Sequence, residues 1–260
     1  MRRHLKFSGG TSNDLHRPYF PRKTEACLIL KVAIHQPNYA PWCGFFAKMN
    51  ACDVFVFYDD AQMTKNSYIN RCLINNQGRQ TWLTIPVSFK LGDKINQVII
   101  SDDRWKHKHM QTLRSVYGRT PFFKEVFGLI EPIYLNTGNS LSQLNMNLIR
   151  VVAAFLELSC QFELSSSIPS DNSSDDRLID ICRALGAGNY ISGKGGDNYQ
   201  DHNKFKTAGI NLVVKTYTPI PYDQKNDSFL PGLSILDALF HVGKNAVDLL
   251  AYEQKESVLP

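Results

Sequence analysis

The sequence predicts an α/β fold: a Rossmann-like, mostly parallel sheet with helices on both faces, a β-hairpin excursion and a helical cap insertion. Residues 28–36 and 53–60 are continuous apolar runs rich in Ile, Val and Phe, as expected for strands that are covered on both faces. Residues 44–52 between them have room for about two helical turns, which completes a compact strand–helix–strand unit.

The middle of the chain alternates in shorter runs and then becomes helical. Residues 68–74 and 81–89 favour a β-hairpin because Asn and Gly between them allow a tight reversal, and residues 95–103 are a further candidate strand. Of the helices that follow, the second is expected to begin with Thr120 as N-cap and Pro121 as first residue. The helices are predicted at 104–118, 120–135 and 140–158, as a cap inserted at about residues 103–158.

The last third of the chain returns to alternating strands and helices, as in parallel α/β units. We predict one domain over residues 29–260, without an internal repeat. Strands are expected at 162–168, 189–193 and 211–217, and helices at 173–187, 203–210 and 234–251.

The net charge of +5 is concentrated at the start of the chain. The first 25 residues hold six Lys/Arg against two Asp/Glu, so the remainder is close to neutral and no nucleic-acid-binding face is expected. Residues 1–28 also lack apolar periodicity and the apolar centre of a secretion signal. We therefore predict that they form a flexible basic N-terminal arm.

Hydropathy and cysteine spacing bear on the cellular compartment. No window approaches the ~18 consecutive apolar residues of a membrane span, and the six cysteines show neither CxxC nor zinc-finger spacing. Several cysteines lie in apolar runs, which suits reduced thiols in a cytoplasmic protein. We expect no membrane span and no disulfide, and we assign no metal ligands. The oligomeric state and the use of a metal are left open.

The loop after the first predicted strand, HQPNYAPWCG, carries many polar and aromatic side chains. Parallel sheets bind ligands beyond the carboxyl ends of their strands, so this loop is a candidate binding site. Its prolines restrict the backbone, its rings can stack on a purine or a sugar, and its glycine permits close approach of a ligand. The alternative is a histidine that only caps the strand and a tryptophan that belongs to the core. The candidates are His35, Gln36, Asn38, Tyr39, Trp42 and Gly44.

A second loop, SGKGGDNYQD at residues 192–201, follows a later strand. Its glycines expose backbone N–H groups and Lys194 adds a positive charge, which suits a phosphate or a carboxylate. The pattern is neither a Walker A loop nor a dinucleotide GxGxxG motif, and a tight connection is the common alternative. The candidate residues are Ser192, Gly193, Lys194, Gly195, Gly196, Asp197 and Tyr199.

A third polar segment, residues 58–71, follows the second predicted strand. Asp59 at the strand terminus is a candidate ligand for a metal or a hydroxyl, and Arg71 can make a bidentate clamp on a carboxylate or phosphate. Gln62 and Asn70 are candidate substrate-binding residues. We expect the three polar segments to converge on one edge of the sheet.

Other polar residues are assigned structural roles. Asp60 is expected to be solvated. His107 and His109, two residues apart on a predicted helix, point in different directions, so a shared metal is not expected. Asp237 and His241, four residues apart, are expected to stabilise the last helix as a pair.

Six ordered motifs resemble the WbqC-like family of bacterial proteins. They are VAIHQPNYAPWCGFFAKM, CDVFVFYDD, NSYINRCLI, WLTIPV, YISGKGGDNY and FLPGLSILDALF, and they extend from about residue 31 to about residue 245. Members of that family are encoded among genes for surface polysaccharides and O-antigen sugars, and some are described as glycine or amino-acid transferases. The resemblance implies a role in the biosynthesis of surface polysaccharides.

A more distant resemblance links HQPNYAPWCGFF and DVFVF to the opening of HIGH-motif nucleotidyltransferases. In that comparison the HxGH positions fall on Trp42, Cys43, Gly44 and Phe45, so both histidines are missing. The segment ISGKGG takes the place of the late phosphate loop of those enzymes. The resemblance implies a nucleotide-binding pocket and leaves two alternatives. Either His35 and Lys194 take over the role of the missing histidines, or the pocket still binds a nucleotide but no longer transfers an adenylyl group.

These observations suggest acyl transfer, with an amino acid as the expected donor, to the amine of a nucleotide-linked aminosugar. In an ATP-dependent form, Lys194 would bind phosphate, Arg71 would orient a carboxylate and His35 would act as general base. Asp59 is the fourth catalytic candidate. ATP is the expected cofactor in that form, and small molecules are the expected partners.

Two other classes of function stay open. One is a non-catalytic accessory protein that binds a nucleotide sugar or a glycan, which the missing HxGH histidines favour. The other is a nucleic-acid binder, which rests only on the basic arm.

Overall fold

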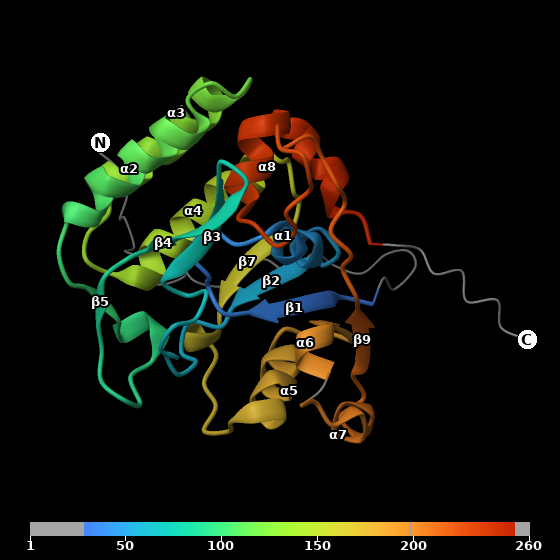
Figure 1. Cartoon of the computed structure of the whole chain (residues 1–260). Helices are drawn as coiled ribbons and strands as arrows, with labels where there is room; N and C mark the ends of the chain where they lie inside the picture. The colour runs from blue at the N-terminus through green and yellow to red at the C-terminus, as the bar shows by residue number, and fades with distance from the viewer. Residues whose placement is uncertain (1–28, 198, 253–260) are drawn as a thin grey trace, which may run out of the picture.

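The computed structural model describes residues 29–197 and 199–252, and these residues form an α/β fold (Figure 1). The predicted fold class is confirmed. The basic arm predicted at residues 1–28 lies outside the described residues. The central sheet has five parallel strands in the order β7 (Gln161–Leu164), β2 (Val54–Phe57), β1 (Lys31–His35), β8 (Asn189–Gly193) and β9 (Asn211–Lys215).

Helices cover both faces of this sheet, as Figure 1 shows with α5 and α7 below β1 and with α1, α4 and α8 above it. No helix in the described part of the chain is both long and apolar enough to cross a membrane. The helices are α1 (Cys43–Asn50), α2 (Arg104–Tyr117), α3 (Phe123–Asn136), α4 (Leu141–Phe155), α5 (Ser174–Ala184), α6 (Lys194–Asp197), α7 (His202–Thr207) and α8 (Ile235–Val242), with 3-10 turns η1 (Ile95–Gln97), η2 (Ser165–Ser167) and η3 (Gly243–Leu250).

Successive side chains of the strands enter two separate cores, because strand residues point alternately to opposite faces. Val32 and Ile34 of β1 pack with Ile179 of α5 and Phe205 of α7. Ala33, between them, packs in the larger core with residues of α1, α4 and α8. Burial on both faces explains why these strands are apolar runs without alternation.

The order of the strands shows that the chain adds strands first on one side of β1 and then on the other. From β1 it proceeds to β2 and later to β7 on one side, and it then returns to β8 and β9 on the other side. Connections that leave adjacent strands in opposite directions open a crevice at the carboxyl ends of those strands. In this chain the two strands are β1 and β8.

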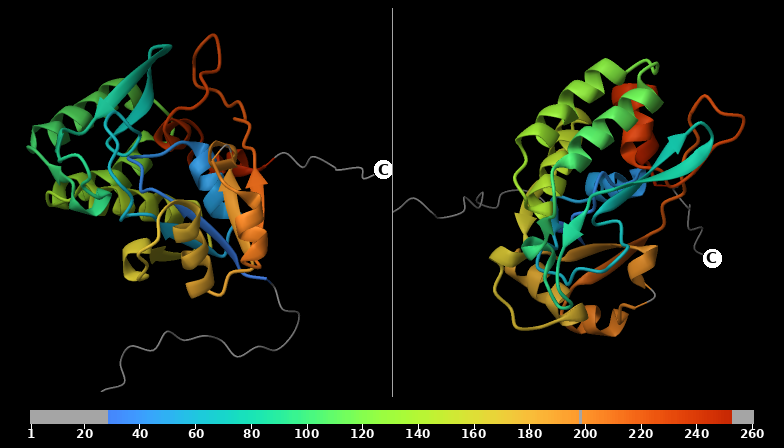
Figure 2. Two further views of the ribbon diagram at one scale, coloured as in Figure 1. Left: turned by 90° about the horizontal axis from the view of Figure 1, so that it is seen from below. Right: turned by 60° about the vertical axis from the view of Figure 1, so that its left-hand side comes forward.

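The predicted β-hairpin is present as β3 (Arg71–Asn76) and β4 (Arg79–Thr84), and Figure 2 shows it projecting from the central sheet. Gln77 and Gly78 at the turn have positive φ angles of 52° and 79°. Glycine adopts such a φ angle without steric strain, which explains the residue at position 78. The strand expected at 95–103 is shorter, because the turn η1 precedes a two-residue strand.

Two further strands form a small ladder of their own, β5 (Val87–Ser88) with β6 (Ile99–Ile100).

The helices α2, α3 and α4 occupy the range predicted for the cap insertion, although α3 begins later than expected. It begins at Phe123, because Thr120 closes the turn after α2 instead of capping α3. The Thr120 hydroxyl donates a hydrogen bond to the carbonyl of Tyr117 at 2.7 Å. That residues 29–260 form a single domain stays a prediction.

The last predicted helix, residues 234–251, is interrupted at Gly243. Helix α8 ends at Val242, Gly243 has a φ of 59°, and the chain continues as the 3-10 turn η3. A Cβ at position 243 would lie 2.5 Å from the ring of Phe122. Close packing and the left-handed backbone therefore both require glycine here.

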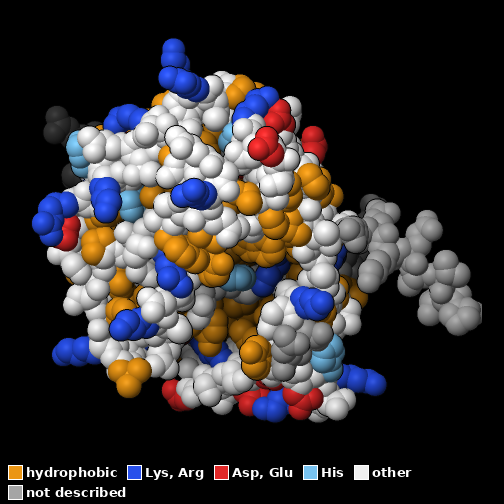
Figure 3. Space-filling view, in the orientation of Figure 1, with side chains coloured by type: hydrophobic (Ala, Val, Ile, Leu, Met, Phe, Trp, Pro, Cys, Tyr) orange, Lys and Arg blue, Asp and Glu red, His pale blue; other side chains and the backbone are white. Residues whose placement is uncertain are grey.

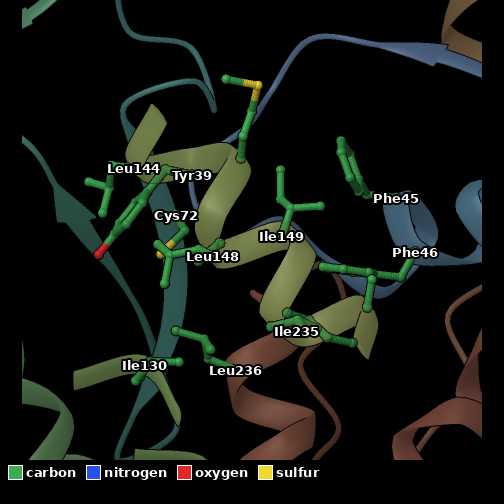
Figure 4. Packing of buried hydrophobic residues seen from close by; sticks show 14 of the residues in the cluster. Tyr39, Phe45, Phe46, Cys72, Ile130, Leu144, Leu148, Ile149, Ile235 and Leu236 are labelled. Atoms are coloured by element: carbon green, nitrogen blue, oxygen red, sulfur yellow. The ribbon is translucent and has the colours of Figure 1, made fainter. Parts of the chain in front are cut away.

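Helix α4 joins the loops that follow β1 and precede β3. Figure 4 shows its side chains Leu144 and Leu148 beside Tyr39 and Cys72 in the core. The fully buried amide of Asn145 donates hydrogen bonds to the carbonyl of Pro37 at 2.8 Å and to that of Ile69 at 2.7 Å. A single side chain therefore satisfies two loop carbonyls inside the protein.

Replacing Asn145 by Ala should destabilise the fold, because it leaves both loop carbonyls buried without these donors. We expect the free energy of unfolding in urea to fall by about 2 kcal/mol or more. The matched control replaces Asn147, an exposed asparagine on the same helix, by Ala. This substitution should change the free energy of unfolding by less than about 0.5 kcal/mol. Equal effects of the two substitutions would contradict this role of Asn145.

Candidate functional site

A cavity of about 540 Å³ lies at the carboxyl ends of β1, β8 and β9. Figure 3, in the orientation of Figure 1, shows the hollow between α1 and α6, with histidine and Lys/Arg surface inside it. It is lined mainly by two of the three predicted polar segments, those that follow β1 and β8, and the third contributes only Tyr58. The volume is in the usual range for a small-molecule site, which is roughly 300–1,000 Å³.

The lining of the cavity is positively charged. Lys48 of α1, Lys194 of α6 and Lys215 of β9 contribute to it. None of the lining residues that the structure describes is Asp or Glu. Such an arrangement favours an anionic ligand.

His35 ends β1 and faces this cavity with a neutral ring. Its Nδ1 lies 2.9 Å from the carbonyl oxygen of Gln36, and since a carbonyl only accepts, the ring proton is on Nδ1. Burial, together with the charge of Lys48, lowers the pKa of His35 to about 3. The ring of Phe45 packs edge-on against it at 4.8 Å. At neutral pH, Nε2 therefore carries a lone pair that can accept a proton.

Lys48 is a lining residue that sequence reasoning missed. It lies on α1 with only 8% of its surface exposed, and its Nζ donates a hydrogen bond to the carbonyl of Ile34 at 3.2 Å. Burial lowers the pKa of Lys48 to about 8. The available signal was a lysine within the otherwise apolar helix that joins two buried strands.

Aromatic rings form one wall of the cavity. Trp42 is 37% exposed and meets Tyr217 edge-to-face at 5.2 Å, and Tyr217 meets Tyr252 at 6.2 Å. The candidate Trp42 is therefore placed in the site, whereas both tyrosines were missed, because they follow the last strand and lie near the end of the chain. These rings offer flat surfaces for a base or a sugar.

Gly44 lines the cavity, but its missing side chain makes room for a protein ring. A Cβ there would lie 2.5 Å from the ring of Trp42. A ligand was expected to approach closely at Gly44. The structure places the ring of Trp42 there instead, folded over the first turn of α1.

The glycine-rich loop forms the opposite side of the cavity. Its lining residues include Ser192, Gly193, Gly195 and Gly196. A Cβ at Gly196 would lie 2.6 Å from the Ser192 hydroxyl and 3.2 Å from an amide oxygen of Gln200, so close packing requires glycine there.

The other two candidates in that loop do not add to the described site. Tyr199 is 85% exposed and is not a lining residue. Asp197 is the last residue of α6, and its side chain lies outside the described part of the structure.

Asp59 lies away from the cavity lining, and its carboxylate is occupied by protein donors. One oxygen accepts from the Ser166 amide at 3.0 Å and from the Ser165 hydroxyl at 3.1 Å. The other accepts from the Ser166 hydroxyl at 2.7 Å and from Asn96 at 3.3 Å. This geometry favours a structural clamp between the ends of β2 and β7.

Asp60 is not solvated, so that expectation is wrong. It forms an ion pair with Arg177 at 3.0 Å, and its other oxygen lies beside the Ser165 hydroxyl, whose single proton it shares with Asp59. Arg177 is itself buried, and it donates to the carbonyl of Ile168 at 2.9 Å. Burying this arginine requires such partners.

The remaining candidates of the third segment also face protein groups instead of the cavity. Arg71 stacks over the ring of Trp82 at 4.1 Å and donates to the carbonyl of Asn66. The Asn70 amide donates to the carbonyl of Ile85 at 2.9 Å. Gln62 is exposed, and its backbone pairs with that of Lys94.

Tyr39 and Asn38 are likewise absent from the described lining of the cavity. Tyr39 is fully buried, and its hydroxyl bonds to His109 Nδ1 at 3.0 Å and to the hydroxyl of Tyr134. Its ring therefore belongs to the core (Figure 4) and offers no stacking surface to a ligand. Asn38 is half-buried.

Asp237 holds the segment that brings Tyr217 to the cavity. Its carboxylate is fully buried and accepts from the hydroxyls of Tyr117 and Tyr222, each at 2.7 Å, and from Gln224 at 3.3 Å. Burial raises the pKa of Asp237. The expected partner His241 bonds mainly to the Asp237 backbone carbonyl, at 2.8 Å, and lies 3.7 Å from its carboxylate.

The structure holds no obvious metal-ligand set among the residues it describes. There, no group of three or more His, Cys, Asp and Glu side chains could hold a metal ion. The five described cysteines are free thiols.

The neutral state of His35 can be tested by titration. Because the folded chain binds this proton only near pH 3, its ring signals in NMR should not shift between pH 8 and 5. An unfolded histidine binds its proton near ~6.5, so acidification below that value should favour unfolding. The variant His35→Gln assigns the signal and should lose this part of the pH dependence. Titration of the His35 ring near its unfolded value would contradict the prediction.

Comparisons with known proteins identify the family of this chain. The model of the WbqC-like protein family matches residues 36–249, a range that includes nearly the whole cavity lining. The chain is also similar to a Mycobacterium tuberculosis protein named "Uncharacterized protein Rv1507c", at 34% identity over 226 residues. That alignment covers 85% of this chain and 98% of the relative. The chain therefore belongs to the WbqC-like protein family.

Proposed function

We propose that the chain is an enzyme of surface-polysaccharide biosynthesis that transfers an acyl group to the amine of a nucleotide-linked aminosugar. The observation that carries the proposal is the composition of the cavity. Three lysines, an aromatic wall and a neutral histidine line one hollow. Family membership supports the pathway, through the resemblance to proteins encoded among polysaccharide genes.

The lysines and the rings suit the two parts of a nucleotide-linked sugar. A diphosphate carries negative charge that Lys48, Lys194 and Lys215 would neutralise. The rings of Trp42 and Tyr217 would stack on the base or on the sugar. A ligand with both features fills this cavity better than either a neutral sugar or a simple anion.

His35 supplies the group that acyl transfer requires. The amine of the aminosugar attacks the acyl carbon, the new amide bond forms, and the bond to the leaving group breaks. The amine must lose a proton during this step. The lone pair on Nε2 of His35, which is free because the ring proton is on Nδ1, would accept it. Arg71 and Asp59 have no part in this scheme, because other protein groups bind both.

The identity of the acyl donor determines whether ATP takes part. An amino acid activated with ATP would release pyrophosphate before the transfer. ATP usually arrives with Mg²⁺, which proteins bind through one or two carboxylates. The described lining contains no carboxylate, which favours either a pre-activated donor or the non-catalytic accessory role.

The resemblance to HIGH-motif nucleotidyltransferases stays a hypothesis. At the positions of the two missing histidines, Trp42 lines the cavity and Phe45 packs against the ring of His35. The pocket therefore has rings where those enzymes have charge-stabilising groups.

The proposal predicts binding and a product. The protein should bind dTDP- or UDP-linked aminosugars in calorimetry. With a mixture of amino acids, supplied both as pre-activated aminoacyl donors and as free acids with ATP, it should increase the mass of the sugar by one aminoacyl residue. The variant His35→Ala should lower turnover by about 10²–10⁴-fold and leave the Kd of the sugar nearly unchanged. The control is His107→Ala, an exposed histidine on α2.

Two results would change the conclusion. Tight binding of the sugar nucleotide without a product, across all amino acids in both free and pre-activated form, would identify the accessory role. Normal turnover of His35→Ala would remove His35 as the base.

A further inference from the structure

Lys48 lines the crevice between β1 and β8. Its Nζ bonds to the carbonyl of Ile34, the residue before His35. Its Cε lies 4.0 Å from the position that a Cβ of Gly193 would take. Lys48 therefore contacts the carboxyl ends of both strands at the point where the chain changes direction.

The ammonium group of Lys48 lacks a counter-charge among the described residues. It is 8% exposed, and the structure describes one hydrogen bond for it, although an ammonium has three protons to donate. A buried charge without a partner lowers the stability of a protein. Other buried ionic groups of this chain are compensated, as Arg177 is by Asp60. A buried, uncompensated lysine that lines a cavity is typical of a functional site.

We propose that Lys48 is the anion-binding residue at the floor of the cavity, and that its ammonium binds a phosphate group of the nucleotide-linked ligand. The proposal rests on the part of the proposed function that places such a ligand here, and it is independent of acyl transfer. Lys194 is exposed at the rim, and Lys215 lies over the ring of Tyr252 at 4.7 Å. Of the three lining lysines, Lys48 is therefore the one whose interaction with a bound phosphate would be weakened least by water.

Anion binding at Lys48 has a consequence for His35. Burial is the largest cause that lowers the pKa of His35, and the charge of Lys48 adds to it. A phosphate beside Lys48 would offset that charge and so raise the pKa of His35 towards the range in which a general base is effective. Ligand binding and activation of the base would then be coupled through one lysine.

The pH dependence of binding can be assigned to Lys48, because most neighbouring groups do not titrate between pH 7 and 9.5. His35 on β1 has a pKa lowered to about 3, and that of Cys52 at the end of α1 is raised well above the range. Burial raises the pKa of Tyr190 on β8 and of Tyr252 to about 12, and it also raises that of Tyr217 and Tyr58. Lys194 and Lys215 are the remaining cations of the lining, and each is replaced separately in the test.

The experiment measures the Kd of ADP-glucose and of inorganic sulfate by calorimetry from pH 6.5 to 9.5. Neither the diphosphate diester nor sulfate titrates in this interval. Because Lys48 loses its proton near pH 8, the affinity of the wild-type protein should fall by up to about tenfold per pH unit above that value. Lys48→Arg keeps a positive charge at all these pH values, so it should bind with little pH dependence.

Matched variants separate Lys48 from the other lysines. Lys194→Met and Lys215→Met should weaken binding but keep the wild-type pH dependence. Lys48→Met should weaken binding by about tenfold or more, because a charge-assisted hydrogen bond is lost. Its thermal unfolding temperature without ligand should be unchanged or higher, since a buried charge is removed.

Three outcomes would overturn the proposal. They are wild-type affinity in Lys48→Met, a pH dependence that persists in Lys48→Arg, and failure of the wild-type protein to bind either probe. Failure of acyl transfer alone would contradict the proposed function and leave this result intact.

Discussion

The parallel pairing of β1 with β8 is the contact on which the cavity depends. The register joins Lys31 to Asn189 and Ala33 to Ile191, so the two strands end side by side. One connection then leaves towards β2 and the other towards β9, which prevents either loop from covering the gap. His35, Lys48 and the glycine-rich loop meet there because of this topology, although the loop lies far from the other two in the sequence.

The fold was predictable because its signals are local. Apolar runs identify strands buried on both faces, and Asn and Gly identify the hairpin turn. The site was predictable where a loop directly follows a strand, as at His35 and Ser192. It was not predictable at Asp59, whose donors Ser165 and Ser166 are supplied by a distant segment. Nor could sequence spacing show that Lys48, inside an apolar helix, faces a cavity.

Polar groups in this fold divide into two kinds according to their partners. The carboxylates of Asp59 and Asp237 each accept several hydrogen bonds from side chains of other segments. These two carboxylates connect segments that are distant in the sequence, and Asp237 also holds the segment that carries Tyr217. Lys48 and His35 have few partners within the protein. Hydrogen-bonding capacity that the protein does not use is available to a ligand, which is why the proposed function rests on the second kind of group.

The use of lysine instead of arginine at position 48 fits a site that is alternately empty and filled. Arginine would stay charged at any physiological pH, so the empty cavity would always contain a buried charge. Lysine can release its proton when no anion is present, and burial already lowers its pKa to about 8. Above about pH 8 the empty protein thus avoids part of the desolvation penalty, and a bound phosphate would hold the proton on Lys48 to higher pH. A magnesium ion would also attract phosphate, but proteins usually hold it through one or two carboxylates, which the described lining does not supply.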